Sequence, residues 1–359
     1  MKLSRRAVET VNSRLWHQLA LGLHPACAIA ACRDGEIVMD LYGGTADPAT
    51  GAKVGDDTLY RVWSCGKPLA AACLWLLKDR GQLDWSDRVA DHWPEYGTQG
   101  KEATTIEHVL THRAGVPGTP EGLTLEESHD PATVVAALAA SRPEYKPGTA
   151  IQYHAATFGW LVLELVNRIS GQPFTDFFRE EVAGPLGMEE TWFGLPPEHH
   201  HRVAKLKTMP GFEDPSPADI GNRPDSYPLV SPGGLCISTA RDLARFYSIL
   251  VSGGEIAGKQ WLRRETISDV TSTHAEGTDI GSERPAKFGL GVQLASDSFG
   301  EKAGPDTFGH SGIGTSISWG DPSVNAGAAI ITTGMQPREV NTERLSTLSD
   351  LVREALASG

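Results

Sequence analysis

Segments typical of β-strands occur at both ends of this 359-residue chain, and helical segments fill its middle. Near the N-terminus, two apolar runs flank the turn-forming residues Arg33, Asp34 and Gly35, a pattern typical of a hairpin. Near the C-terminus, strand patterns occur in FGLGVQLA (288–295), FGHSG (308–312), TSISWGD (315–321) and AGAAIITTGM (326–335). This distribution predicts one antiparallel sheet assembled from both termini, with helices flanking it and a mainly helical region inserted between its halves.

The expected class is therefore α/β, of the α+β type. Helices are predicted over 3–20, from near Ser64 to near Gly81, at several places in 100–195, over 239–252 and over about 342–357. Residues 196–230 are rich in proline, glycine and charge, and they predict a long irregular loop. We expect residues 1–63 and 236–359 to form the α/β region and residues 64–235 the helical region, with an active site between them.

Composition excludes several classes of function. The net charge of -13 and the absence of a Lys/Arg cluster argue against nucleic acid and anionic membranes as partners. The five cysteines are scattered, with no CxxC pair, so neither a disulfide framework nor a zinc site is indicated. The apolar part of the N-terminus is interrupted by His17, His24 and Pro25, so we expect no signal peptide, no membrane span and a cytoplasmic location. No feature indicates an oligomeric state.

A serine and a lysine lie three residues apart in RVWSCGKPLAAACLWLL, at the start of a predicted apolar helix. Ser64 and Lys67 would share one face of that helix. Burial among apolar groups would leave the lysine neutral and able to remove the serine proton, which a hydroxyl nucleophile requires. An SxxK pair on a solvated surface is the simpler alternative, because the pattern is common by chance.

Two further motifs favour the catalytic interpretation. Tyr153 follows a Pro-Gly turn and precedes a helix, and His310, Ser311 and Gly312 lie at a predicted strand late in the chain. In this order, SxxK, a tyrosine motif and a Lys/His-Ser/Thr-Gly strand, the sequence resembles the serine β-lactamase and penicillin-binding-protein superfamily. The likeness extends over nearly the whole chain, and it is strongest to the β-lactamase-like carboxylesterases called family VIII.

The resemblance implies a role for each of these residues. Ser64 corresponds to the acylated nucleophile, and Lys67 and Tyr153 to the general base. His310, Ser311 and Gly312 would line the substrate, and the backbone N–H groups of Ser64 and Ile313 would form the oxyanion hole. No metal or organic cofactor is expected.

The chain departs from the lactamase pattern at two positions. Ala155 stands where a Tyr-x-Asn motif has its amide, and His310 stands where a lysine usually helps to bind a carboxylate. Both losses favour a neutral, small-molecule ester over a β-lactam or a peptide. The predicted activity is hydrolysis of short-chain carboxylic esters through an acyl-enzyme. Acyl transfer, β-lactamase or D-amino-acid peptidase activity, and a binding protein without turnover are the alternatives.

Other motifs carry weaker interpretations. GHSGIG lacks the final glycine of a nucleophile elbow, and the His108/His112 pair lacks the glutamate of HExxH, so we expect His112 to anchor a turn. Cys65 is expected to pack, and the SPGGL turn (231–235) to lie close to the pocket. Apolar residues of the 196–230 loop are expected to cover the bound acyl group: Leu206, Met209, Phe212 and Tyr227.

Overall fold

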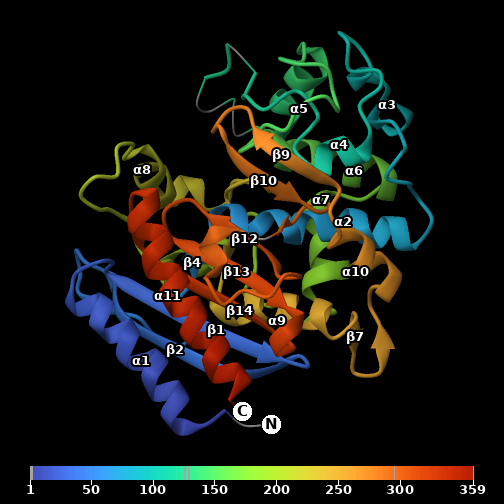
Figure 1. The fold of residues 1–359 in the computed structure, drawn as a ribbon. Helices are drawn as coiled ribbons and strands as arrows, with labels where there is room; N and C mark the ends of the chain where they lie inside the picture. Colours follow the sequence, from blue (N-terminus) through green and yellow to red (C-terminus); the bar gives the residue numbers. More distant parts are fainter. Residues whose placement is uncertain (1–2, 121, 125–126, 128–129, 295, 359) are drawn as a thin grey trace.

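A nine-stranded antiparallel sheet forms the centre of the molecule (Figure 1), in the strand order β3-β2-β1-β14-β13-β12-β11-β10-β9. The computed structural model describes residues 3–358 apart from 121, 125–126, 128–129 and 295. The strands are β1 (Ala26–Arg33), β2 (Glu36–Asp47), β3 (Ala52–Lys53), β9 (Ala275–Asp279), β10 (Arg284–Phe288), β11 (Gln293–Leu294), β12 (Phe308–Gly312), β13 (Ser316–Asp321) and β14 (Ala326–Thr332). Because β1 pairs with β14, the sheet joins the two ends of the chain, and the predicted fold class is confirmed.

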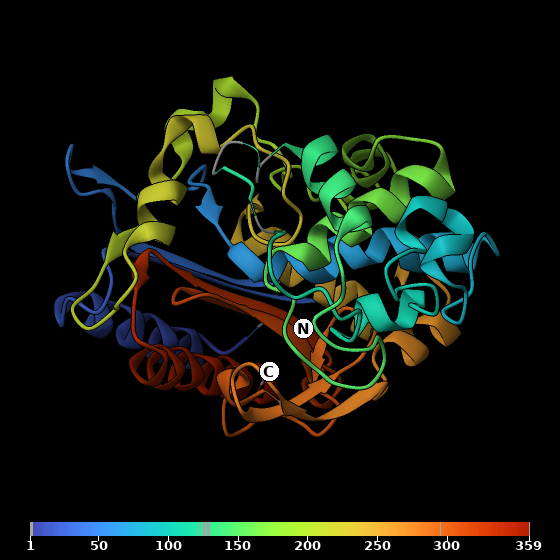
Figure 2. The ribbon, with the colours of Figure 1, turned by 90° about the horizontal axis from the view of Figure 1, so that it is seen from above.

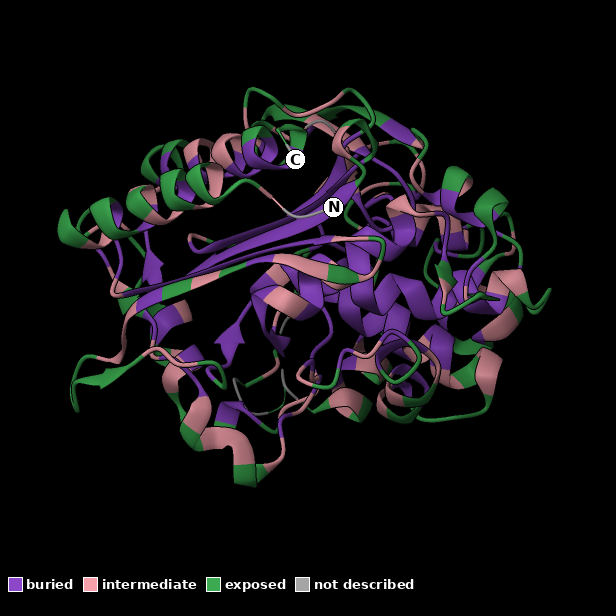
Figure 3. Cartoon of the chain, turned by 90° about the horizontal axis from the view of Figure 1, so that it is seen from below, coloured by how far each residue is buried: buried purple, intermediate pink, exposed green. Residues whose placement is uncertain are grey.

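Helices cover both faces of the sheet (Figure 2). On one face α1 (Arg5–Ala20) and α11 (Arg338–Ala357) pack over β1, β13 and β14. On the other face α9 (Ala240–Val251) lies against β14, where a side chain at Gly327 would meet the backbone of α9 at 2.3 Å. The central strands are consequently buried on both sides, whereas α1 and α11 expose their outer surfaces (Figure 3). This explains why β1 and β14 are continuous apolar runs without alternation.

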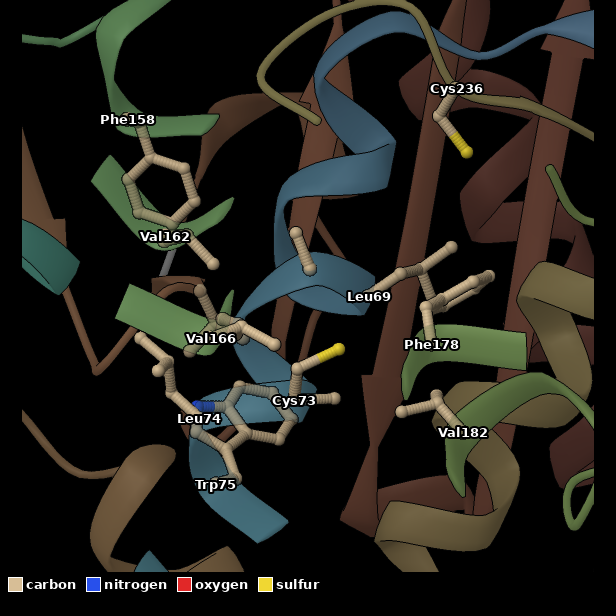
Figure 4. Close-up of a cluster of buried hydrophobic side chains, with 14 of the residues drawn as sticks. Leu69, Cys73, Leu74, Trp75, Phe158, Val162, Val166, Phe178, Val182 and Cys236 are labelled. Atoms are coloured by element: carbon tan, nitrogen blue, oxygen red, sulfur yellow. The ribbon is translucent and has the colours of Figure 1, made fainter. Parts of the chain in front are cut away.

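The inserted region is built around α2 (Lys67–Asp79), whose residues from Lys67 to Leu77 are all buried. Figure 4 shows its side chains among Phe158 and Val162 of α6 (Thr157–Ser170) and Phe178 and Val182. A helix that is apolar all round needs such complete enclosure. The remaining helices are α3 (Val89–His92), α4 (Ile106–Leu110), α5 (Pro131–Ala140), α7 (Phe174–Phe177), α8 (Ser216–Asn222) and α10 (Arg264–Val270). No helix among the described residues is both long and apolar enough to cross a membrane.

Two local predictions were wrong, one hairpin was not predicted, and one helix boundary differs. The 196–230 segment contains a 3₁₀ helix (Pro197–Arg202), α8, and β5 (Lys207–Thr208), which pairs in parallel with β15 (Gly334–Met335). The predicted strand 288–295 divides between the end of β10 and β11, and residue 295 lies outside the described residues. The β9–β10 hairpin was not predicted, because the middle of β9 is polar and exposed and carries no apolar alternation. The final helix also begins earlier than predicted, at Arg338.

Short two-stranded pairings complete the structure. β4 (Tyr60–Arg61) pairs with β6 (Ile237–Ser238), and β7 (Glu255–Ile256) pairs with β8 (Lys259–Gln260). The β4–β6 pair lies immediately before the SxxK segment, so it ties the start of that segment to the strand that follows the SPGGL turn.

Candidate active site

Ser64 lies in a single 3₁₀ turn, Trp63–Gly66, that leads directly into α2. The residues on either side of it are buried, and Ser64 alone in this turn is partly exposed. Trp63 has a φ of 51°, a left-handed conformation that a bulky residue rarely adopts. Its indole packs in a buried cluster with Leu206 and Leu235, and such surrounding contacts are what hold a residue in an unfavourable backbone conformation. The turn therefore presents the Ser64 hydroxyl from a rigid, buried support.

Lys67 is completely buried at the first position of α2. Its Nζ lies 3.1 Å from Ser64 Oγ, 2.7 Å from the carbonyl oxygen of Ala155 and 2.5 Å from that of Gly233. Burial lowers the pKa of Lys67 from 10.5 to about 7. Among the described residues, no carboxylate forms an ion pair with it. The amine is therefore poised to exchange a proton near neutral pH, and the alternative of a solvated surface pair is excluded.

The SPGGL turn reaches Lys67 because two glycines touch. A Cβ on Gly159, in the first turn of α6, would lie 1.9 Å from the backbone nitrogen of Gly233. Only a residue without a side chain allows this approach. The contact fixes the Gly233 carbonyl against Lys67, so the expectation that this turn lies close to the pocket is confirmed.

Tyr153 completes the group around the SxxK pair. Its ring centre lies 4.9 Å from Lys67 Nζ. Burial raises the pKa of Tyr153 above its ordinary value, while a hydrogen bond with the Ser64 hydroxyl acts in the opposite direction. The structure thus brings Ser64 and Lys67, from the start of α2, together with Tyr153, from the segment before α6.

Strand β12 carries the third motif to the same place. Its His310 is buried with its ring centre 6.0 Å from that of Tyr153, and its Nδ1 lies 2.8 Å from the Ser311 carbonyl oxygen. Burial, followed by the positive charge of Lys67, lowers the pKa of His310 to about 3. The imidazole is therefore neutral, with its proton on Nδ1, and its Nε2 has no hydrogen-bond partner among the described residues.

The end of β12 approaches the Trp63–Gly66 turn closely. A Cβ on Gly312 would lie 2.5 Å from the Val62 carbonyl oxygen, so a glycine is needed there. Ile313 follows in the turn to β13 and is 48% exposed. The residue pair proposed for the oxyanion hole, Ser64 and Ile313, thus belongs to two backbone segments that are in contact.

Sequence reasoning missed Gln293. Its side-chain oxygen on β11 accepts hydrogen bonds from the backbone N–H and the hydroxyl of Ser311, at 3.2 and 3.3 Å. The sequence predicted the two strands that carry Gln293 and Ser311 but not their register. The structure pairs Gln293 with Gly309, which places its side chain near Ser311. The contact occupies both donors of Ser311.

Two other predictions concern residues around Tyr153 and Ser64. His112 has a φ of 59° and its Nδ1 accepts the backbone N–H of His154 at 3.1 Å, so its role in anchoring a turn is confirmed. The thiol of Cys65 donates to the His310 carbonyl oxygen at 3.2 Å, and burial raises its pKa to about 11. Cys65 therefore packs as an un-ionised thiol, as predicted.

The apolar residues of the 196–230 segment have two different environments. Leu206 and Phe212 pack near Trp63, the residue before Ser64, and the Phe212 ring approaches Gly314 in the turn after Ile313. Tyr227 instead joins Leu59, Leu195, Val203 and Ile237 in a separate buried cluster. The expectation that Tyr227 covers the bound acyl group is therefore wrong, because its surface is already used in packing.

Comparison with known protein families identifies the family of this chain. The family model described as Beta-lactamase matches residues 19–350. The chain belongs to the β-lactamase family. Esterase/beta-lactamase LipL of Mycobacterium tuberculosis is 31% identical, over 92% of this chain and 82% of that protein.

Solved structures of the family agree with this assignment. A family VIII carboxylesterase superposes with a TM-score of 0.90 at 27% identity, covering 99% of each chain. A penicillin-binding protein homologue from Caulobacter crescentus superposes with a TM-score of 0.89 at 28% identity, again over 99% of each chain. Like its esterase relatives, this β-lactamase-family protein is a serine hydrolase.

Proposed function

We propose that the protein is a carboxylesterase that hydrolyses neutral, short-chain esters through an acyl-enzyme on Ser64. The observation that carries the proposal is the environment of Lys67 Nζ, which contacts Ser64 Oγ and two backbone carbonyl oxygens in a completely buried position. We predicted a helical region over residues 64–235 and an α/β region on either side of it. With this division the helical region supplies Ser64, Lys67 and Tyr153, the sheet supplies β12, and the proposed site lies between them.

The three contacts of Lys67 suit a neutral amine. Such an amine has two N–H donors and one lone pair. In the structure Lys67 Nζ donates to Ser64 Oγ and to the carbonyl oxygens of Ala155 and Gly233. When Lys67 is neutral, the two carbonyl oxygens accept its two remaining N–H donors and its lone pair faces the Ser64 hydroxyl. Lys67 can then act as the general base without a metal or a histidine–aspartate pair.

The reaction has two halves. In the first, the Ser64 proton passes to the coupled Lys67/Tyr153 base and Ser64 Oγ bonds to the ester carbonyl carbon. The N–H groups of Ser64 and Ile313 stabilise the oxyanion, the C–O bond breaks, and the base returns the proton to the leaving alcohol. In the second half, water loses a proton to the same base, attacks the acyl-enzyme, and releases the acid and a protonated Ser64.

The polar groups around the site favour a neutral substrate. His310 is neutral, Ala155 offers no side-chain amide, and both donors of Ser311 are bonded to Gln293. A substrate carboxylate would thus find none of these groups free to bind it. A site selects a polar substrate only when it offers matching hydrogen-bonding groups. Because these groups are missing here, we expect neutral esters to be better substrates than β-lactams.

Labelling and turnover test the proposal together. Intact-mass spectrometry after treatment with a fluorophosphonate should show one added phosphonyl group on the wild type and on the Cys65→Ala control, and none on Ser64→Ala. kcat/KM should be much higher for p-nitrophenyl butyrate than for nitrocefin. Retention of more than a few per cent of esterase activity by Ser64→Ala would move the assignment to Ser311.

The same assay separates the alternatives. Nitrocefin turnover equal to that of the ester would show a β-lactamase, and the absence of any added mass would show a binding protein. An added alcohol distinguishes hydrolysis from acyl transfer, because a transferase would release mainly the new ester in place of the acid.

A further inference from the structure

The hairpin β9–β10 lies at the edge of the sheet (Figure 1). It packs against the segment that carries Tyr153. The backbone of Ile151 forms a parallel bridge with Asp279, and the Ile280 N–H donates to the Ile151 carbonyl oxygen at 2.9 Å. Tyr153 itself packs partly against the apolar cluster that includes Ile151 and Phe288. A hairpin of the sheet therefore meets the inserted region beside the proposed base.

Asp279 is the polar centre of this contact. It is 5% exposed, and one carboxylate oxygen, Oδ2, accepts the backbone N–H of Tyr153 at 2.6 Å. The other oxygen, Oδ1, accepts the N–H groups of Gly281 and Ser282 at 3.0 and 2.7 Å. Among the described residues, Asp279 forms no ion pair. Its burial without a cation is tolerated because three N–H donors solvate it.

We propose that Asp279 is a positioning residue, which holds Tyr153 in the geometry needed for proton transfer with Ser64 and Lys67. The inference rests on the proposed function. Asp279 fixes the Tyr153 backbone by accepting the N–H group of Tyr153. His112 acts from the other side, because its ring packs against the tyrosine ring at a centre-to-centre distance of 4.6 Å and a tilt of 45°, and it accepts the N–H of His154. Both peptide groups that flank Tyr153 are thereby fixed.

A carboxylate is required because both oxygens must accept. Asparagine has the same shape but only one acceptor oxygen, and its NH₂ group would face an N–H donor on one side. In Asp279→Asn either Tyr153 or the hairpin turn loses its hydrogen bond, while packing is unchanged. Displacement of a reacting group by about 1 Å can cost on the order of 100-fold in rate.

The experiment compares Asp279→Asn with Asp242→Asn as a matched control. Asp242, on α9, is also buried and accepts a backbone N–H, from Glu190, but its hydrogen-bond partners Glu190 and Thr191 are not residues of the proposed site. With p-nitrophenyl butyrate, Asp279→Asn should lose tenfold to a hundredfold in kcat with KM within about twofold, whereas Asp242→Asn should keep its kcat. If Asp279→Asn keeps kcat within twofold of wild type, the inference is wrong.

A double-mutant cycle shows whether the effect passes through the tyrosine. In a Tyr153→Phe background, Asp279→Asn should lower kcat by less than threefold, because the group that it positions is already absent. Equal losses in both backgrounds would reduce Asp279 to a general structural role. Should Asp279→Asn fail to fold, Asp279→Glu, which keeps both oxygens but moves them, is expected to fold and to show the same loss of kcat.

The cycle also distinguishes the two hypotheses. Full activity of Tyr153→Phe would contradict the proposed base, and the inference would fall with it. A severely impaired Tyr153→Phe beside a fully active Asp279→Asn would contradict the inference alone.

Discussion

Lys67→Met should remove esterase activity and also change how the stability of the protein depends on pH. Burial lowers the pKa of Lys67 from 10.5 to about 7, so the unfolded chain binds more protons than the folded protein between these values. Stability of the wild type therefore rises with pH across that window. With about 1.4 kcal/mol for each pH unit, this one group costs the folded state about 4 kcal/mol at pH 7 and about 2 kcal/mol at pH 9.

Methionine is similar in length and does not titrate. It leaves the carbonyl oxygens of Ala155 and Gly233 without their donor, which is a penalty of about 1–3 kcal/mol for each at any pH. That constant penalty cancels when two pH values are compared. The free energy of unfolding of Lys67→Met, minus that of the wild type, should thus fall by about 2 kcal/mol from pH 7 to pH 9, because the wild type alone gains stability over this range.

Urea unfolding of the wild type and of Lys67→Met at pH 7 and pH 9 measures this change. The control is Lys259→Met, at an exposed position, whose stability relative to wild type should be the same at both pH values. In parallel, kcat/KM of the wild type should rise with pH and level off above about 7, since only the neutral amine accepts a proton. If the stability of Lys67→Met relative to wild type is the same at both pH values, the reasoning is refuted, because the pKa of Lys67 in the folded protein would then be ordinary.

Three further predictions follow from the same geometry. Tyr153→Phe and Lys67→Met should each be severely impaired in ester turnover, and the double variant should be little worse than the worse single one; strictly multiplicative losses would show two independent roles. Phe212→Ala should change the ratio of butyrate to octanoate kcat/KM by about tenfold and leave acetate turnover nearly intact; an unchanged ratio with a lower melting temperature would make Phe212 a packing residue. Gly159→Ala should abolish soluble expression or lower the melting temperature sharply, because its Cβ would lie 1.9 Å from the Gly233 nitrogen; wild-type stability would show that the turn moves freely.

Local pattern was sufficient for the elements with a strong period or composition. The apolar run after Lys67 could only be a buried helix, and the serine–lysine phase on it follows from helical geometry. The strands at both chain ends likewise required one shared sheet, and the pairing of β1 with β14 satisfies that requirement. The order of the three motifs was enough to identify the family, since motif order is a property of the sequence itself.

The surroundings of Lys67 and Tyr153, the proposed base, were decided only by the tertiary structure. Lys67 donates hydrogen bonds to the backbone carbonyl oxygens of residues 155 and 233. Every residue has such a carbonyl, so the sequence does not indicate which two contact the lysine. Asp279 lies 126 residues from its partner Tyr153, on a hairpin whose polar sequence has no apolar alternation. Which carboxylate becomes buried, and which lysine loses its water, depends on how distant segments pack, because desolvation is a property of the assembled chain and not of any local stretch.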